Sequence, residues 1–268
     1  MAGSTSVFSG SIPEFYDRLL GPALFEPYAI DLVGRLPSDE SLRVLELACG
    51  TGIVTRRLRE ALHSSATLVA TDLNEPMILY ASDAVPDAGI TWQQADAQAL
   101  PFEDGSFDVV VCQFGFMFLP DKPQGFREAL RVLAPGGMLL ANIWHSLEDN
   151  PPAAVIDATV ARLFPASPPR FLKTPYGYNE RERIARDMAA AGWKDVHLET
   201  LQLESLTASA EGFASGFALG SPLTHELVER QADLDEVVRV LTAALVPVGG
   251  DRPFRATLSA MVVHGVRD

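Results

Sequence analysis

The stretch that decides the fold is Arg43 to Gly52, which reads RVLELACGTG. Its first half is an apolar run that predicts a buried strand, and its second half is a glycine turn. Apolar residues spaced three and four apart follow, as on one face of a helix: Val54, Leu58, Ala61 and Leu62. Glycines in such a turn let a ligand approach the backbone closely, because no Cβ stands in the way. The same turn can also serve as a tight connection without a ligand, so its surroundings decide the interpretation.

The strand and helix pattern continues along the chain. Short apolar runs predict parallel strands, and the segments between them predict crossover helices, such as the one with its apolar face at Phe126, Ala129, Leu130 and Leu133. The turns Asp104-Gly105 and Pro135-Gly136-Gly137 precede the fourth and fifth strands. The expected strands are residues 43–47, 68–71, 90–93, 109–112, 138–143, 196–203 and 256–266. We therefore expect an α/β fold, a Rossmann-like, doubly wound, mostly parallel seven-stranded sheet with helical cap insertions.

The remaining segments predict a cap over one edge of this sheet. Neither interruption of the pattern has enough apolar sequence to be an independent domain. We expect one domain over residues 1–268, with its core at about 30–148, 180–204 and 255–268. The cap elements are then about 1–29, 149–179 and 205–254. Because right-handed crossovers bring the carboxyl ends of parallel strands to one edge, the ligand site is expected there.

Two nucleotide-binding motifs are disfavoured by the residues after the glycine turn. A dinucleotide fingerprint needs a third glycine where Thr55 stands, and a P-loop needs Gly-Lys-Ser/Thr. Asp72, at the end of the second strand, can accept hydrogen bonds from ribose hydroxyls, although it could equally cap the next helix. Asp96, at the end of the third strand, could accept a hydrogen bond from the exocyclic amine of adenine.

Composition favours a small-molecule substrate. The chain has 268 residues and a formal charge of −14, which repels polynucleotides, and the run Arg56-Arg57-Leu58-Arg59 is read as a solvated helix face. We therefore expect no nucleic-acid partner. Polar and charged residues interrupt the first thirty positions, so no signal peptide or membrane span is expected, and the cytoplasm is the expected location. Cys49 and Cys112 lack partners at metal-ligand spacing, so we expect reduced, buried thiols and no metal site. A homo-oligomer is left open.

Five segments, in order and at suitable separations, together resemble the class I S-adenosylmethionine-dependent methyltransferases, in particular the ubiquinone/menaquinone-biosynthesis type. They are LELACGTG at 45–52, ATDLNEPM at 70–77, DAQALPF at 96–102, FDVVVCQF at 107–114 and RVLAPGG at 131–137. Ala48 stands where many members of that family have glycine, which adds only a methyl group.

The resemblance implies S-adenosylmethionine as cofactor, S-adenosylhomocysteine as product and transfer of the methyl group to a small molecule. By the resemblance, Ala48, Gly50 and Gly52 lie against the methionine part and Asp72 holds the ribose. Leu73 and Met77 then pack on the adenine, and Asp96 and Ala97 reach its edge. Gln113 and Phe114 lie near the methyl group, and Tyr16 belongs to a helix that closes over the cofactor. The full set of implied cofactor residues is Tyr16, Glu46, Ala48, Gly50, Thr51, Gly52, Asp72, Leu73, Met77, Asp96, Ala97, Gln113 and Phe114.

The acceptor side of the site is less defined by sequence. His145 directly follows the fifth strand at the ligand edge and is a candidate general base, although it could also be a hydrogen-bonded histidine without a role in proton transfer. Aromatic residues that could line an acceptor pocket, or simply pack, are Phe114, Phe116, Phe118, Tyr176 and Tyr178. Asn150-Pro151-Pro152-Ala153 resembles the Asn-Pro-Pro-aromatic motif of amino-nitrogen methyltransferases. It stands in the wrong place and lacks the aromatic residue, so a loop role is expected.

Two other functions remain as alternatives to methyl transfer. One is an enzyme of the same fold that uses the sulfonium charge for an isomerisation or cyclisation. The other is a non-catalytic module that binds the cofactor.

Overall fold

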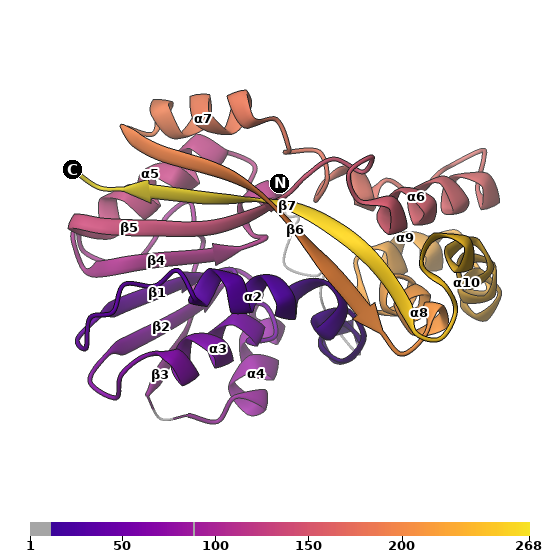
Figure 1. Cartoon of the computed structure of the whole chain (residues 1–268), viewed down its shortest axis with the longest axis horizontal. Coiled ribbons are helices and arrows are strands. Elements are labelled where there is room, and N and C mark those ends of the chain that lie inside the picture. The colour runs from indigo at the N-terminus through magenta and orange to yellow at the C-terminus, as the bar shows by residue number, and fades with distance from the viewer. Residues whose placement is uncertain (1–11, 88) are drawn as a thin grey trace.

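One seven-stranded sheet organises the computed structural model, which describes residues 12–87 and 89–268 (Figure 1). The strand order is β3-β2-β1-β4-β5-β7-β6, with β7 antiparallel to both of its neighbours and the other pairings parallel. The strands are β1 (Arg43–Leu47), β2 (Thr67–Asp72), β3 (Ile90–Gln94), β4 (Phe107–Gln113), β5 (Leu133–Trp144), β6 (Asp195–Thr207) and β7 (Phe254–Val266). This arrangement confirms the predicted doubly wound, mostly parallel sheet.

Helices cover both faces of the sheet, which buries the apolar strands from two sides. Helices α2 (Glu26–Val33) and α3 (Ile53–Ala61) pack together on one face, while α5 (Lys122–Val132) and α7 (Arg181–Ala190) pack together on the other (Figure 1). Helix α4 (Glu75–Ala84) connects β2 with β3. The central strands β1 and β4 are almost completely buried, as their near-continuous apolar sequences require.

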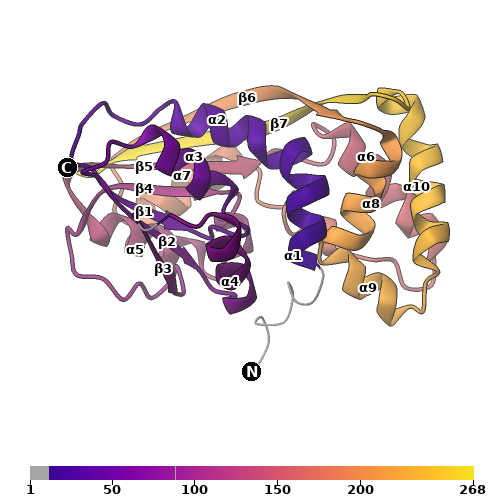
Figure 2. The same cartoon turned by 90° about the horizontal axis from the view of Figure 1, so that it is seen from below.

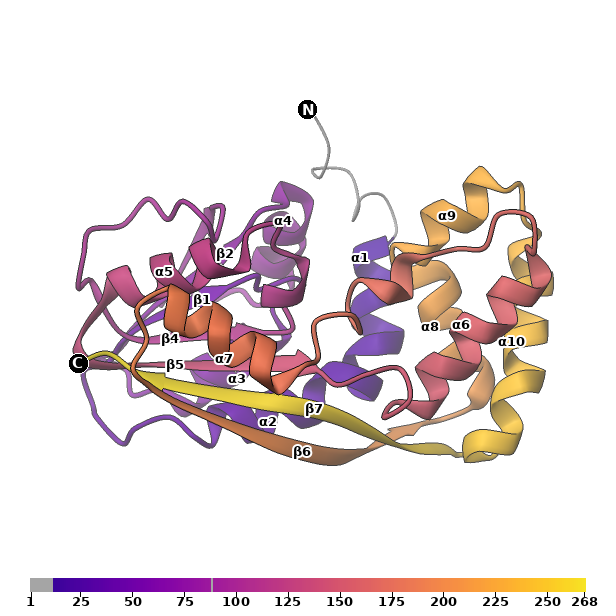
Figure 3. The same ribbon diagram turned by 90° about the horizontal axis from the view of Figure 1, so that it is seen from above.

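The long strands β6 and β7 extend beyond the parallel strands toward a second group of helices (Figures 2 and 3). These helices are α6 (Pro151–Leu163), α8 (Ala210–Gly220), α9 (Leu223–Glu229) and α10 (Leu234–Gly249), with a short turn, η3 (Phe171–Lys173), beside α9. Helix α10 packs on both α6 and α8. The predicted cap segments thus fold as helices beside the sheet, and the division of the chain into one core and its cap stays a prediction.

The described N-terminal segment lies between the sheet and these helices. It consists of α1 (Ile12–Phe15) and the wide π-helix η1 (Tyr16–Phe25), which contains Pro22 and packs against α8. A run of π-helix is rare, and such turns occur often at functional sites. This segment lies between the sheet and the helices α6, α8, α9 and α10, at the end of the sheet where β1 and β4 terminate (Figure 2).

One strand begins earlier than the sequence predicted. Leu133 pairs with Phe107, whereas Met138 pairs with Val109, so the intervening residues of β5 are looped out of the ladder. Gly136, in this irregularity, has φ of +80°. The prediction that Leu133 belongs to the helix is therefore wrong, because α5 ends at Val132 and Leu133 already pairs in the sheet.

Within the described ranges, no helix is both long and apolar enough to cross a membrane. The same residues contain no group of three or more His, Cys, Asp or Glu side chains placed to hold a metal ion. Cys49 and Cys112 are free and buried, and burial raises the pKa of the Cys112 thiol to about 12.

Candidate functional site

The carboxylate of Asp72 joins the ends of strands β1 and β2. Its Oδ2 accepts a hydrogen bond from the backbone N–H of Gly50 at 3.0 Å, and its Oδ1 accepts two from Asn74, at 2.8 Å and 3.1 Å. Asp72 is 7% exposed, and burial raises its pKa while these N–H donors lower it. Because an ionised carboxylate has about four acceptor positions, about one remains for a ligand.

The two glycines of the turn have different roles. Gly50 has φ of +55°, and a Cβ built on it meets no atom within 4 Å, so open space adjoins its backbone. Gly52 has φ of +84°, and a Cβ there would lie 3.2 Å from Val85 and 3.3 Å from Ala81. Gly52 thus allows close packing against α4, whereas Gly50 leaves room for a ligand. Ala48 also has a positive φ, of 53°, a conformation that costs energy for a residue with a Cβ.

Glu46 is a buried acid next to this turn. It is 1% exposed, and its Oε2 has no hydrogen-bond partner among the described residues. Burial and the nearby negative charge of Asp72 raise the pKa of Glu46 to about 8. A buried carboxylate without a partner is costly, so Glu46 is a candidate for binding a cationic group.

The raised pKa makes stability depend on pH. Because the folded pKa lies above the ordinary 4.5, Glu46 supports folding fully below pH 4.5, and this support is lost as the pH rises toward 8. When the pH is raised from 5 to 9, the free energy of unfolding of the wild type should fall by about 2–4 kcal/mol more than that of Glu46→Gln. Urea unfolding at the two pH values measures this difference. Exposed Glu103→Gln is the control, and parallel pH profiles of wild type and Glu46→Gln would contradict the assignment.

Asp17 attaches the N-terminal segment to the glycine turn. Its Oδ1 accepts a hydrogen bond from the Thr51 hydroxyl at 3.1 Å, and its Oδ2 accepts one from Tyr80 of α4 at 3.4 Å. Burial, and the negative charges of Asp72 and Asp17, raise the pKa of Tyr16. Tyr16 therefore lies close to Asp72 and to the glycine turn, although η1 is far from both in the sequence.

An aromatic cavity of about 60 Å³ lies beside this edge. Its walls come from η1, the ends of β4 and β5, the segment around η3, and the turn between α8 and α9. The lining residues are Tyr16, Leu20, Leu24, Phe25, Phe114, Phe118, Trp144, Phe171, Leu172, Pro175, Tyr176, Phe217, Ser221 and Pro222. A mostly apolar lining with few polar atoms is typical of small-molecule sites.

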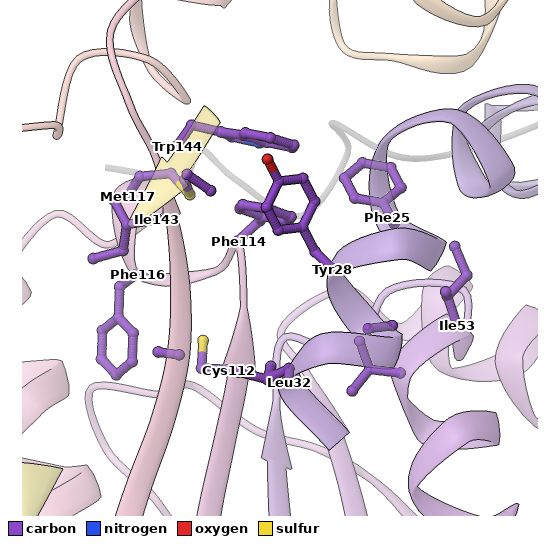
Figure 4. Close-up of a cluster of buried hydrophobic side chains, with 14 of the residues drawn as sticks. Phe25, Tyr28, Leu32, Ile53, Cys112, Phe114, Phe116, Met117, Ile143 and Trp144 are labelled. Carbon is purple, nitrogen blue, oxygen red and sulfur yellow. The ribbon is translucent and has the colours of Figure 1, made fainter. Parts of the chain in front are cut away.

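Stacked rings form one wall of the cavity (Figure 4). The rings of Phe114 and Trp144 are parallel within 4°, with centroids 3.8 Å apart, and Tyr28 meets both edge-on at 5.4 Å and 5.2 Å. Phe114 has φ of 55°, a strained conformation for a bulky residue. Such strain persists only where the surroundings impose it and often accompanies functional sites. The contacts with Trp144 and Tyr28 supply that constraint.

Several residues implied by the resemblance do lie along this edge. Asp72 and Asp96 end or follow β2 and β3, and the Asp96 carboxylate accepts a hydrogen bond from the Gln98 N–H at 2.8 Å. Met77 is buried, Leu73 is 38% exposed and Ala97 is half-buried. Of this group, Asp72 contacts the glycine turn directly, through the N–H of Gly50.

Gln113, at the end of β4, forms a hydrogen bond with the N-terminal segment of the chain. Its Nε2 donates to the Phe25 carbonyl at 3.1 Å, at the end of the π-helix, while its Oε1 has no partner in the described chain. Its neighbour Asn142 on β5 is fully buried, and neither of its amide atoms has a partner in that part of the chain. These unpaired polar atoms lie near the carboxyl ends of β4 and β5.

Three residues expected on the acceptor side do not line the cavity. Phe116 is fully buried and stacks on Phe126 at 4.2 Å. Tyr178 donates to Asp187 at 2.8 Å, beside α7. His145 follows Trp144, so the alternation of the strand turns it to the opposite face, where its Nε2 lies 3.2 Å from Thr200 Oγ1. Burial, the largest effect, lowers the pKa of His145.

Asn150 has a structural role in the described fold. Its side chain donates to the carbonyl of Ser259 at 3.0 Å and accepts from the N–H of the same residue at 2.9 Å. It directly precedes Pro151, the first residue of α6. Asn150 thus fixes the start of α6 against β7.

Sequence reasoning missed much of the cavity wall. Trp144, Phe25 and Phe171 come from three separate segments, and Asp17 was not singled out. Only Trp144 carries a local signal, because it is a large aromatic residue at the end of a predicted strand, where a side chain can face a ligand. Nothing local marks the others, because their role depends on how the cap packs.

Comparison with known proteins agrees with this geometry. Residues 45–141, which run from β1 into β5, match the family described as "Methyltransferase domain". The chain is also 36% identical over 145 residues to the ubiquinone/menaquinone biosynthesis C-methyltransferase UbiE of Ectopseudomonas mendocina (strain ymp), over 53% of this chain and 55% of that protein. The chain thus spans about half the length of the curated relatives it matches.

Two solved structures illustrate the likeness of this fold to known ones. Phosphoethanolamine N-methyltransferase 2 of Haemonchus contortus, in complex with S-adenosyl-L-methionine, has a TM-score of 0.62 at 17% identity, covering 98% of this chain and 58% of that one. The [4+2]-cyclase SpnF has a TM-score of 0.56 at 17% identity, covering 90% of this chain and 81% of that one. At these identities the likeness concerns the fold alone.

Proposed function

We propose that this protein is an S-adenosylmethionine-dependent methyltransferase that acts on a small molecule and releases S-adenosylhomocysteine. The observation that carries the proposal is the edge of the methyltransferase domain. There an open space lies beside Gly50, Asp72 keeps an acceptor position, and Tyr16, which lines the aromatic cavity, is close enough to Asp72 for its charge to act on it. We place the protein in the cytoplasm, without a nucleic-acid partner, and we assign the cap residues to acceptor binding within one domain.

The residues at the edge fit this cofactor better than a dinucleotide. Asp17, Asp72 and Asp96 are carboxylates that would repel a diphosphate, whereas Asp72 can accept from a ribose hydroxyl. Glu46, buried and with an unbonded oxygen, would accept a cationic group. In this proposal, Leu73 and Met77 pack on the adenine, Asp96 and Ala97 reach its edge, and Tyr16 covers it from η1.

The chain's residues then align the reactants and exclude water. When bound, the cofactor would supply an electrophilic methyl carbon, which takes an electron pair from the acceptor while the carbon–sulfur pair stays on sulfur. The aromatic walls would hold the acceptor in line and keep water out, which can lower a barrier by about 7–11 kcal/mol. Among the described residues that line the cavity there is no carboxylate or imidazole. The acceptor must therefore bring an available electron pair, and His145 keeps a role in hydrogen bonding to Thr200.

Incubation of the purified protein with S-adenosylmethionine and a panel of phenols, enols, thiols and amines tests this proposal. Mass spectrometry should detect S-adenosylhomocysteine and an equal amount of a product that is heavier than the acceptor by about 14 mass units, the mass of one methylene group. Conversion of an acceptor without S-adenosylhomocysteine would point to an isomerase or cyclase instead. A protein that binds S-adenosylmethionine but converts nothing would be a binding module, and one that does not bind it would refute the proposal.

A further inference from the structure

The aromatic cavity contains one polar atom whose purpose the fold does not explain. Tyr176 lies in the segment that follows η3 and is 5% exposed, and its ring lines the cavity. Its hydroxyl makes no hydrogen bond within residues 12–87 and 89–268, and its oxygen is not among the fully enclosed unpaired atoms of that range, so a small molecule can reach it. The hydroxyl is therefore in position to bind a molecule that enters the cavity.

The other hydroxyls of the lining are already engaged. Ser221 Oγ donates to the Phe217 carbonyl at 2.7 Å and accepts from the Leu223 N–H at 3.2 Å. Tyr16 stacks on Phe25, with centroids 4.7 Å apart, and lies close enough to Asp17 and Asp72 for their charges to act on it. Tyr16 therefore belongs to the cofactor side, which leaves Tyr176 to supply polar recognition on the acceptor side.

The rings around Tyr176 define the shape of what it would bind. Its centroid lies 5.9 Å from that of Trp144, which continues into the stack with Phe114. Phe118 and Phe171 stack loosely at 6.5 Å, and Phe118 is 43% exposed, so this pair forms the mouth of the cavity. Planar walls favour a planar ligand that stacks against them.

We propose that Tyr176 is a specificity-determining residue whose hydroxyl donates a hydrogen bond to an oxygen of a planar methyl acceptor lying against Trp144. This inference rests on the proposed function, which it deepens by naming the class of acceptor. Burial raises the pKa of Tyr176, so the hydroxyl keeps its proton and acts as a donor throughout the neutral range. Phenols, enols and their conjugate bases have the required oxygen.

Two probes that differ by one hydroxyl group test the assignment. We would measure the affinities of 2-naphthol and naphthalene for the full chain by equilibrium dialysis. The ratio of the two affinities isolates recognition of the oxygen, because both molecules have the same rings and differ only in the hydroxyl group. In Tyr176→Phe we expect this ratio to fall by about three- to tenfold, with little change in naphthalene binding.

Tyr178→Phe is the matched control, because Tyr178 is also buried but donates to Asp187 outside the cavity. It should leave the ratio unchanged. An unchanged ratio in Tyr176→Phe, an equal fall in Tyr178→Phe, or no binding of either probe to the wild type would each overturn the proposal. Calorimetry with S-adenosylmethionine on the same proteins separates this result from the proposed function. Loss of cofactor binding in the wild type would refute the function, whereas intact cofactor binding with an unchanged ratio refutes only the role of Tyr176.

Discussion

Asp72→Asn is expected to lower the affinity for S-adenosylmethionine by roughly 30- to 150-fold, or about 2–3 kcal/mol. The carboxylate already accepts hydrogen bonds from Gly50 and Asn74 and, in the proposed complex, accepts a further one from the ribose. Asparagine is of the same size but presents an N–H group where one of these oxygens stands. It therefore loses acceptors on both the protein side and the ligand side.

Titration calorimetry of wild type and variant with S-adenosylmethionine measures the effect, and the thermal midpoint reports whether the variant is folded. Asp83→Asn, an exposed position on α4, is the matched control and should bind like the wild type. An affinity within threefold of the wild type in folded Asp72→Asn would show that Asp72 only fixes the glycine turn.

Trp144→Ala is expected to lower the free energy of unfolding by about 3–5 kcal/mol and to weaken 2-naphthol binding at least tenfold. Trp144 is 4% exposed and contacts the rings of Phe114, Tyr28 and Tyr176, so truncation leaves a large void among them. Removal of the stacking partner also releases Phe114 from its strained conformation. Affinity for S-adenosylmethionine should change much less, because Asp72 and Gly50 keep their places.

Trp193→Ala separates the two effects. Trp193 is equally buried, but its Nε1 donates to the Phe126 carbonyl at 2.9 Å, on the face covered by α5 and α7. Urea unfolding should show a comparable loss of stability, while the naphthol affinity stays near that of the wild type. If both tryptophan variants lost naphthol binding equally, the loss would reflect general destabilisation and the cavity assignment would be wrong.

The sheet could be predicted because its determinants are local, and the proposed cofactor residues were placed by the same local patterns. The run from Arg43 to Gly52 places a strand, a turn and a helix start within ten residues, and the position of Asp72 follows from the same strand and helix periodicity. Since parallel strands share one carboxyl edge, residues that end different strands meet there without any knowledge of side-chain packing. Seven strands in the expected arrangement follow from such patterns.

The sequence alone thus determined the fold class and which residues end the parallel strands, because short-range periodicity encodes both. Only the tertiary structure decided which side chains form the cavity. One residue of register separates Trp144, which faces the cavity, from His145, which faces Thr200 on the other side of the sheet. Phe25, Phe171 and Tyr176 come together through packing between segments far apart in the chain, and that packing has no local sequence signal.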